Sequence, residues 1–210
     1  MLKHGDDFMK VLAAVMVFFI QSQLICGEEI GIPSFNKSDP GVVNLLEDGL
    51  EDWKAEDGKG IDNWIVRNRI LTNYKHGSHL VTKKKYRDFD LSLEFLLPHK
   101  GNSGVYLRGR YEVQLDDHNT TDQIKSTGAI WGKIPIESHV YNGPNRWNQL
   151  SIRIRNNSVT VLVNRNPVIR SKELKGTTRG AIDENESAPG PILLQSLKGA
   201  RFKNILIKEL

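Results

Sequence analysis

The sequence of 210 residues contains only one cysteine, Cys26, so no disulfide within the chain can stabilise the fold. Histidine and cysteine form no group with metal-ligand spacing, which gives no support for a zinc site. The sequence also lacks a glycine-rich phosphate loop and a nucleophile elbow. Carboxylates are suitable ligands for Ca²⁺, but nothing in their spacing requires it. We therefore expect a fold stabilised by core burial, with no metal and no cofactor.

The sequence has little excess charge, with a formal net charge of +4, and its basic residues are spread among acidic ones. No block of like charge of the kind that marks nucleic-acid binding is present. Residues 83–85 are the only dense basic cluster, and a solvated strand end or turn explains them better than a phosphate site. We expect no nucleic-acid partner.

The sequence has no apolar run of the roughly 20 residues that a membrane-spanning helix needs. Its longest such run, residues 11–20, follows Lys10 and is typical of the central region of a secretory signal peptide. Cleavage after Cys26 or Gly27, where the side chains become small, would make residues 1–27 the signal peptide. We therefore expect an exported protein, periplasmic or extracellular, with no transmembrane segment in the mature chain.

Two details of the N-terminal region leave alternatives open. Acidic residues at positions 6 and 7 are unusual ahead of such an apolar run, so Met9 is an alternative start. Cys26 would be a lipid-attachment site if the residues before it formed a lipobox, but Ile25 stands where a small residue is wanted.

Residues 28–41 are polar and contain proline and glycine, which indicates a linker, and residues 42–210 have the length of one domain. Within this domain, apolar and polar residues alternate with the period of β-strands, and no helical stripe of useful length occurs. Alternation covers residues 89–95, 105–107, 111–115, 150–155, 159–163 and 202–207. Turn residues separate these segments, most clearly Asn156-Asn157, which favours a tight hairpin. The sequence predicts an all-β sandwich or jelly roll.

Polar side chains on the predicted strands are candidates for a functional site. Residues two apart on a strand point the same way, so Glu112, Gln114 and Asp116 share one face. If the three strands are neighbours, Glu94 and Arg108 converge with them. Carboxylates beside a guanidinium suit acid–base work on a sugar, whereas the alternative is a solvent-facing surface of cross-strand ion pairs.

Some finer points limit or extend this interpretation. Glu112 and Asp116 lie about 13 Å apart along one strand, too far to form a direct glycosidase pair, so any such pair needs another strand. Trp131, Trp147 and Tyr106 lie near turns or strand ends, where each is either a core residue or a platform for a sugar ring.

Successive motifs of the sequence resemble those of the 3-keto-disaccharide hydrolase domain family. The specific part is the pair of segments NSGVYLRG and YEVQLDD, at residues 102–109 and 111–117. Weaker matches are LVTKKKYRDFDL (80–91), GAIWG (128–132) and GPILLQ (190–195), and Arg165 stands where the family has a turn glycine. The resemblance spans residues 42–210.

This resemblance implies a concanavalin A-like jelly roll, typically exported by bacteria that degrade glycans, which cleaves glycosides oxidised to a ketone at sugar carbon 3. The ketone acidifies the proton on carbon 2, so a base can remove it and expel the substituent on carbon 1 before water adds. The implied catalytic residues are Glu112 or Asp116 as the base, Arg108 with Gln114 polarising the ketone, and Glu94 as the acid or its orienting group. Other matching positions are expected to bind the sugar: Lys83, Asn102, Tyr106, Trp131, Asn148 and Gln195.

Several questions remain open at the level of sequence. Asn148 and Gln195 are equally suited to be buried turn anchors. A non-catalytic carbohydrate-binding module is one rival function, and a laminarinase-like glycosidase is another, although Gln114 stands where that group would have an acid. The aglycone, the anomer and the oligomeric state are not specified.

Overall fold

The computed structural model describes residues 35–118 and 120–210, and these residues form strands and loops but no helix. The larger sheet contains β1 (Val42–Asn44), β3 (Trp64–Arg67), β4 (Ile70–Asn73), β6 (Phe89–Leu96), β9 (Asn148–Arg155), β10 (Ser158–Val163), β11 (Asn166–Glu173) and β13 (Arg201–Glu209). The smaller sheet contains β2 (Trp53–Ala55), β5 (Leu80–Thr82), β7 (Asn102–Leu107), β8 (Tyr111–Asp116) and β12 (Leu193–Leu194).

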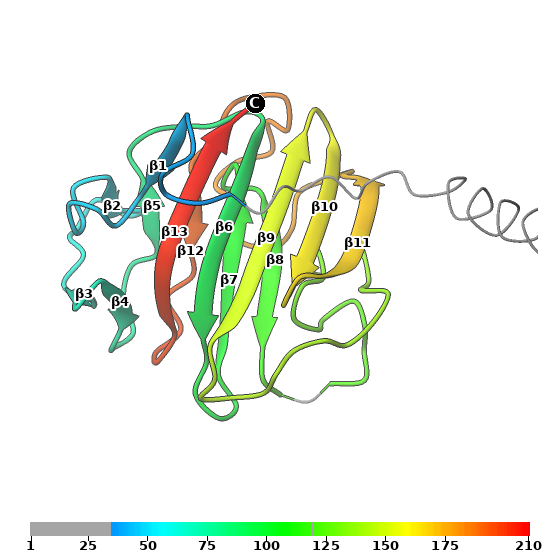
Figure 1. The fold of residues 1–210 in the computed structure, drawn as a ribbon, viewed down its shortest axis with the longest axis horizontal. Helices are drawn as coiled ribbons and strands as arrows, with labels where there is room; N and C mark the ends of the chain where they lie inside the picture. The colour runs from blue at the N-terminus through cyan, green and yellow to red at the C-terminus, as the bar shows by residue number, and fades with distance from the viewer. Residues whose placement is uncertain (1–34, 119) are drawn as a thin grey trace, which may run out of the picture. The chain divides into compact units, whose positions relative to one another are not determined.

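All strand pairs in both sheets are antiparallel. The larger sheet has the order β11-β10-β9-β6-β13-β4-β3, with β1 also paired to β13, and the smaller one has the order β2-β5-β12-β7-β8. The two sheets pack face to face, with β6 and β9 in front of β7 and β8 in Figure 1. The described chain is therefore an antiparallel β-sandwich of the jelly-roll type, as the sequence predicted.

The core of the sandwich is made by one set of alternate residues from each sheet. Leu91, Leu93 and Phe95 of β6 are buried against Val113 and Leu115 of β8 within one apolar cluster. The strands predicted from alternation at β6, β7, β8, β9, β10 and β13 are thus confirmed. Removing this apolar area from water is the main stabilising contribution, at about 25 cal/mol per Å².

The predicted hairpin at Asn156-Asn157 is also confirmed, since it joins β9 to β10 in register and Asn156 has a φ of 52°. A second turn joins β10 to β11 through Asn164 and Arg165, at φ values of 51° and 66°. Arg165 therefore occupies the left-handed conformation that glycine adopts without strain. This explains why a glycine is expected at that position.

The sequence did not predict the short strands β1 to β5 and β12, nor the irregular β11. Strand β12 consists of only Leu193 and Leu194, which are both buried because the sheet is covered on both sides at this point. Strand β12 therefore shows no alternation of apolar and polar residues. In β11 the pairing with β10 shifts register around Val161, which breaks the period.

The predicted signal peptide and the first half of the predicted linker, residues 28–34, lie outside the described residues. Among the residues that are described, no helix is long and apolar enough to cross a membrane.

Candidate functional site

The pairing of β7 with β8 places a set of polar side chains on the outer face of the smaller sheet. Asn102 pairs with Asp116, Gly104 with Gln114, and Tyr106 with Glu112. Directly paired residues point to the same side of a sheet. The side chains of Asn102, Tyr106, Glu112 and Gln114 therefore face away from the core formed by Val105, Val113 and their neighbours.

This outer face is hollowed into a cavity of about 350 Å³. Of the residues that the sequence singled out, the cavity brings together Asn102, Tyr106, Glu112, Gln114, Trp131 and Gln195. It also contains His79, Arg179 and Gly180, which the sequence did not indicate. The NSGVYLRG and YEVQLDD motifs thus form the floor of one cavity because they are adjacent strands.

Glycine at position 104 makes room for the Glu112 carboxyl group. A Cβ added to Gly104 would lie 2.9 Å from Cγ and 3.0 Å from Cδ of Glu112, and closer still to Oε1. Real Cβ atoms are almost never found within 3.0 Å of such neighbours. The Glu112 side chain therefore lies flat across β7, over the only residue type that leaves space for it.

Glu112 is a buried carboxyl group, with 5% of its surface exposed. Burial raises its pKa to about 7, while the nearby Tyr106 hydroxyl acts in the opposite direction. Burial removes water from the carboxyl group and so penalises its charged form, which is why the pKa of Glu112 is raised. A carboxyl with a pKa near 7 can accept and return protons at neutral pH, as general acid–base catalysis requires.

The segment that follows β11 forms one wall of the cavity. Thr178 binds to β8 through its hydroxyl, which accepts a hydrogen bond from the amide of Glu112 at 2.9 Å and donates one to the carbonyl of Arg110 at 3.0 Å. The Tyr106 hydroxyl donates to the carbonyl of Arg179 at 2.9 Å. A Cβ on Gly180 would meet that hydroxyl at 2.7 Å, so glycine allows this close approach. These contacts hold Arg179 at the rim.

Two further polar groups are oriented within the cavity. The amide of Ser196 donates a hydrogen bond to Nδ1 of His79 at 3.0 Å, so Nδ1 is the acceptor and the ring proton of neutral His79 is on Nε2. Gln195 is fixed by its own amide, which donates to the carbonyl of Gly104 at 2.9 Å. Its buried Oε1 has no hydrogen-bond partner among the described residues. The cavity therefore offers both donors and acceptors to a ligand.

The prediction that Glu94 converges with Glu112 is wrong. Glu94 lies on β6, and β6 belongs to the larger sheet, so the two carboxyl groups are on different sheets. On its own face, Glu94 accepts a hydrogen bond from Asn204 at 2.7 Å and forms an ion pair with Lys203 at 3.1 Å. Alternation located the polar face of each strand but carried no information on which strands pair.

The prediction that Arg108 joins this face is also wrong. Arg108 lies in the tight turn between β7 and β8 with a φ of 52°, which interrupts the alternation that the prediction assumed. Its buried guanidinium donates to Asp88 at 2.9 Å and to the carbonyl of Asn156 at 2.8 Å, and also to the carbonyl of Arg87. Arg108 therefore ties this turn to the β9–β10 hairpin, and its donors are used there.

The remaining predicted residues lie around other cavities. Asp116 lies at the end of β8, where it lines a neighbouring cavity together with Asp117. Lys83 is exposed and lines a separate depression near β5. Asn148 is buried, and its Oδ1 accepts hydrogen bonds from the amide of Asn142 at 2.9 Å and from Nδ2 of Asn164 at 2.8 Å. Asn148 is therefore a turn anchor, one of the two roles considered for it.

No pattern in the sequence indicated that His79 and Arg179 belong to the site. His79 precedes the three-residue strand β5, and Arg179 lies in a loop about 70 residues from Glu112 in the sequence. Only the pairing of β5 with β12, and of β12 with β7, brings His79 to this cavity. Within residues 35–118 and 120–210, no group of three or more metal-ligating side chains is placed to hold a metal ion.

The fold and this cavity define a jelly-roll domain of the concanavalin A-like kind, with a polar pocket on its smaller sheet. Residues 41–208 match the model of the 3-keto-alpha-glucoside-1,2-lyase-like domain, and the chain belongs to this family. This confirms the resemblance drawn from the NSGVYLRG and YEVQLDD motifs. The family identifies the chain as a carbohydrate-active domain.

Solved structures agree with this assignment. A protein of Parabacteroides distasonis described as a candidate glycosyl hydrolase is 28% identical, with a TM-score of 0.70 over 81% of this chain and 84% of that one. A second such protein from the same organism is 21% identical, with a TM-score of 0.69 over 81% and 94%. The carbohydrate-binding module CBM66 of Bacillus subtilis shares the fold, with 11% identity and a TM-score of 0.52 over 75% and 96%. No curated protein matches the chain.

Proposed function

We propose that this protein cleaves 3-keto-glycosides, including 3-keto-disaccharides, by elimination followed by hydration at the sugar bound in the Glu112 cavity. The observation that carries the proposal is the buried Glu112 carboxyl, which has a pKa of about 7 and lies within the residues that match the family model. The P. distasonis protein at 28% identity, described as a candidate glycosyl hydrolase, agrees with a glycoside substrate.

The chemistry requires a base for the proton on carbon 2 of the sugar, and Glu112 is the carboxylate available in the cavity. When the carbon 2 proton moves to Glu112, electron density moves to the ketone oxygen, and an amide donor such as Gln114 stabilises it there. The bond from carbon 1 to the leaving oxygen then breaks. Glu112 returns its proton to that oxygen, because a carboxyl with a pKa near 7 serves as base and acid at neutral pH.

Hydration completes the proposed reaction. Water adds to the enone with its hydroxyl on carbon 1 and a proton on carbon 2, so the net result is hydrolysis. Trp131 at the cavity wall offers an aromatic surface for the sugar ring, and Asn102 and Gln195 offer amide groups for its hydroxyls. Glu94 and Arg108 have no part in this scheme, because neither lies in the cavity.

The proposal is tested with a 3-keto-glucoside and the same glucoside in unoxidised form, each carrying a chromogenic aglycone. We expect release of the aglycone from the keto form only, because only the ketone acidifies carbon 2. Release from the plain glucoside would instead indicate a conventional glycosidase. Binding without release from either compound would indicate a non-catalytic carbohydrate-binding domain, and either result would overturn the proposal.

We further propose that the protein is exported and that its reaction needs no cofactor. Export rests on the signal-peptide pattern of residues 1–27, and the elimination needs only proton transfers, because the ketone is already part of the substrate. Cleavage after Cys26 or Gly27 would be visible in the mass of the mature protein.

A further inference from the structure

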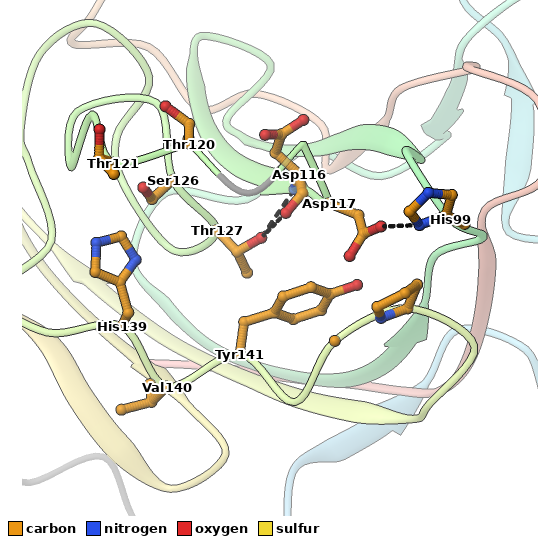
Figure 2. Close-up of a pocket in the computed structure, with 12 residues that line it drawn as sticks. His99, Asp116, Asp117, Thr120, Thr121, Ser126, Thr127, His139, Val140 and Tyr141 are labelled. Atoms are coloured by element: carbon orange, nitrogen blue, oxygen red, sulfur yellow. Dashed lines mark hydrogen bonds and ion pairs between the residues drawn. The ribbon is translucent and has the colours of Figure 1, made fainter.

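A second and larger cavity lies at the end of β8, beside the Glu112 cavity. Its volume is about 580 Å³. Figure 2 shows Asp116 and Asp117 on one side of it, and Tyr141 and His139 on the other. The reaction proposed above uses none of these residues, so this cavity is not explained by it.

The two cavities are parts of one surface. Asn102 lines the Glu112 cavity, and its Nδ2 donates a hydrogen bond at 2.9 Å to Oδ1 of Asp116, which lines the second cavity. Glu112, Gln114 and Asp116 lie at alternate positions of β8 and so follow one another along one face. Four steps along the strand separate Glu112 from Asp116 by about 13 Å, with Gln114 between them, so the two cavities follow one another along β8.

A single loop also borders both cavities. Residues 126–131 run beside β8 and are held to it by hydrogen bonds from the amide of Trp131 to the carbonyl of Glu112, at 3.0 Å, and from the amide of Asp116 to the Thr127 hydroxyl, at 2.8 Å. Trp131 lines the Glu112 cavity, whereas Thr127 lines the second one (Figure 2). These hydrogen bonds therefore fix both walls relative to β8.

The lining of the second cavity has the chemistry of a site for an uncharged polyhydroxyl group. The side chains of Asp116 and Asp117 are each only 7% exposed, and the Asp117 carboxylate is oriented by the amide of Lys100, which donates to it at 2.8 Å. Carboxylates accept hydrogen bonds from sugar hydroxyls. No lysine or arginine is among the described residues that line the cavity. Its two carboxylates are paired with imidazoles, Asp117 with His99 at 3.5 Å and Asp116 with His118. The lining therefore favours a ligand that donates hydrogen bonds over an anion.

Tyr141 gives this cavity a rigid wall. Its ring is stacked on Phe95 of the core, with the ring centroids 6.2 Å apart and the planes 7° from parallel. Its hydroxyl is buried without a hydrogen-bond partner among the described residues and points toward the Asp117 side of the cavity (Figure 2). Burial and the nearby Asp117 carboxylate raise the pKa of Tyr141, so the phenol stays protonated.

We propose that this second cavity binds the leaving sugar of a 3-keto-disaccharide while the oxidised sugar occupies the Glu112 cavity. The inference rests on the proposed function and adds the place on the smaller sheet at which a leaving sugar binds. Asp116, which the sequence placed among the catalytic residues, would then be a binding residue for that sugar.

The test compares a 3-keto-glucose disaccharide with 3-keto methyl glucoside as substrates. In Asp117→Asn we expect kcat/KM for the disaccharide to fall about tenfold or more, because its second ring loses a hydrogen bond to a charged group. The methyl glucoside has no second ring, so its kcat/KM should change little. Asp48→Asn is the matched control, because Asp48 is exposed and borders neither cavity. Equal effects on both substrates, or none on either, would overturn the inference.

A second variant covers the case in which Asp117→Asn does not fold. His139 is exposed and lines the same cavity, so His139→Ala removes a contact without disturbing the core. It should lower kcat/KM for the disaccharide severalfold and leave the methyl glucoside unchanged. If the ratio of kcat/KM for the disaccharide to kcat/KM for the methyl glucoside is the same in this variant as in the parent, the second sugar site is contradicted.

Direct binding separates failure of this inference from failure of the proposed function. If the parent protein turns over neither substrate, the proposed function fails, and the unoxidised disaccharide is titrated into the parent and into the two variants by NMR. Weaker binding in the variants would still support a sugar site. Binding that is absent or unchanged would overturn it, as would binding of Ca²⁺ that disappears in Asp117→Asn while sugar binding does not change.

Discussion

Replacement of Glu112 by glutamine is expected to lower turnover of a 3-keto-glucoside at least 100-fold while the protein stays folded. Glutamine is nearly the same size and fills the space above Gly104, but it cannot take a proton from carbon 2. The loss should appear in kcat, because the proton is transferred in the transition state and not in the bound ground state. Single-turnover kinetics with saturating enzyme measure this directly.

Glu94→Gln is the matched control for this variant. It makes the same chemical change on the larger sheet, away from the cavity, and should retain the parental rate. Circular dichroism would verify that both variants are folded. A Glu112→Gln protein with near-parental turnover would show that another group is the base.

The same substitution is expected to make the protein more stable at pH 8, but not at pH 4. The pKa of Glu112 is about 7 in the folded protein and is taken as 4.5 when unfolded, so between these values the folded state holds the proton more tightly. Stability therefore falls as pH rises from about 4.5 to about 7, and the full penalty, of order 3 kcal/mol, remains above pH 7. Glutamine carries no such penalty at any pH.

Urea denaturation of the parent and of Glu112→Gln at pH 4, 6 and 8 measures this difference. The free energy of unfolding of the variant, minus that of the parent, should increase by about 3 kcal/mol over this range. A constant difference would mean that the Glu112 carboxyl titrates normally and is well hydrated. In that case its role as a base near neutral pH would lose its physical basis.

The fold was largely predictable because each long strand packs the side chains of one face into the core and carries polar residues on the other face. β6, β8, β9 and β13 each place alternate residues in the core, and the sequence records this as alternation. Short strands such as β12 carry too few residues for a period to be visible. Their positions are fixed by pairing with distant strands, which a local pattern does not contain.

The candidate site was predictable in part for the same reason. Glu112 and Gln114 share a strand, and Asn102 and Tyr106 lie on the adjacent one in the hairpin, so local rules were sufficient. Glu94 was misplaced because strands neighbouring in sequence were assumed to be neighbours in the sheet, whereas β6 pairs with β9 and β13. This assumption commonly fails in jelly rolls, whose long connections cross between sheets.

Arg108 was misplaced for a different reason, namely the turn chemistry. The positive φ of Arg108 and of Gly109 turns the chain sharply between β7 and β8, so the alternation of β7 ends at Leu107. The guanidinium then becomes part of a buried network with Asp88. Removing one partner of such a pair leaves a buried charge uncompensated, so substitution of Arg108 is expected to act on folding.

The most direct test of the mechanism is the fate of the proton on carbon 2 of the sugar. The protein is incubated with a 3-keto-glucoside in D₂O, and the product is followed by proton NMR, with authentic 3-keto-glucose in the same buffer to measure spontaneous exchange. Elimination and hydration predict that the enzymatic product carries deuterium on carbon 2 from the first turnover. A product that keeps its original hydrogen on carbon 2 would contradict proton removal by Glu112.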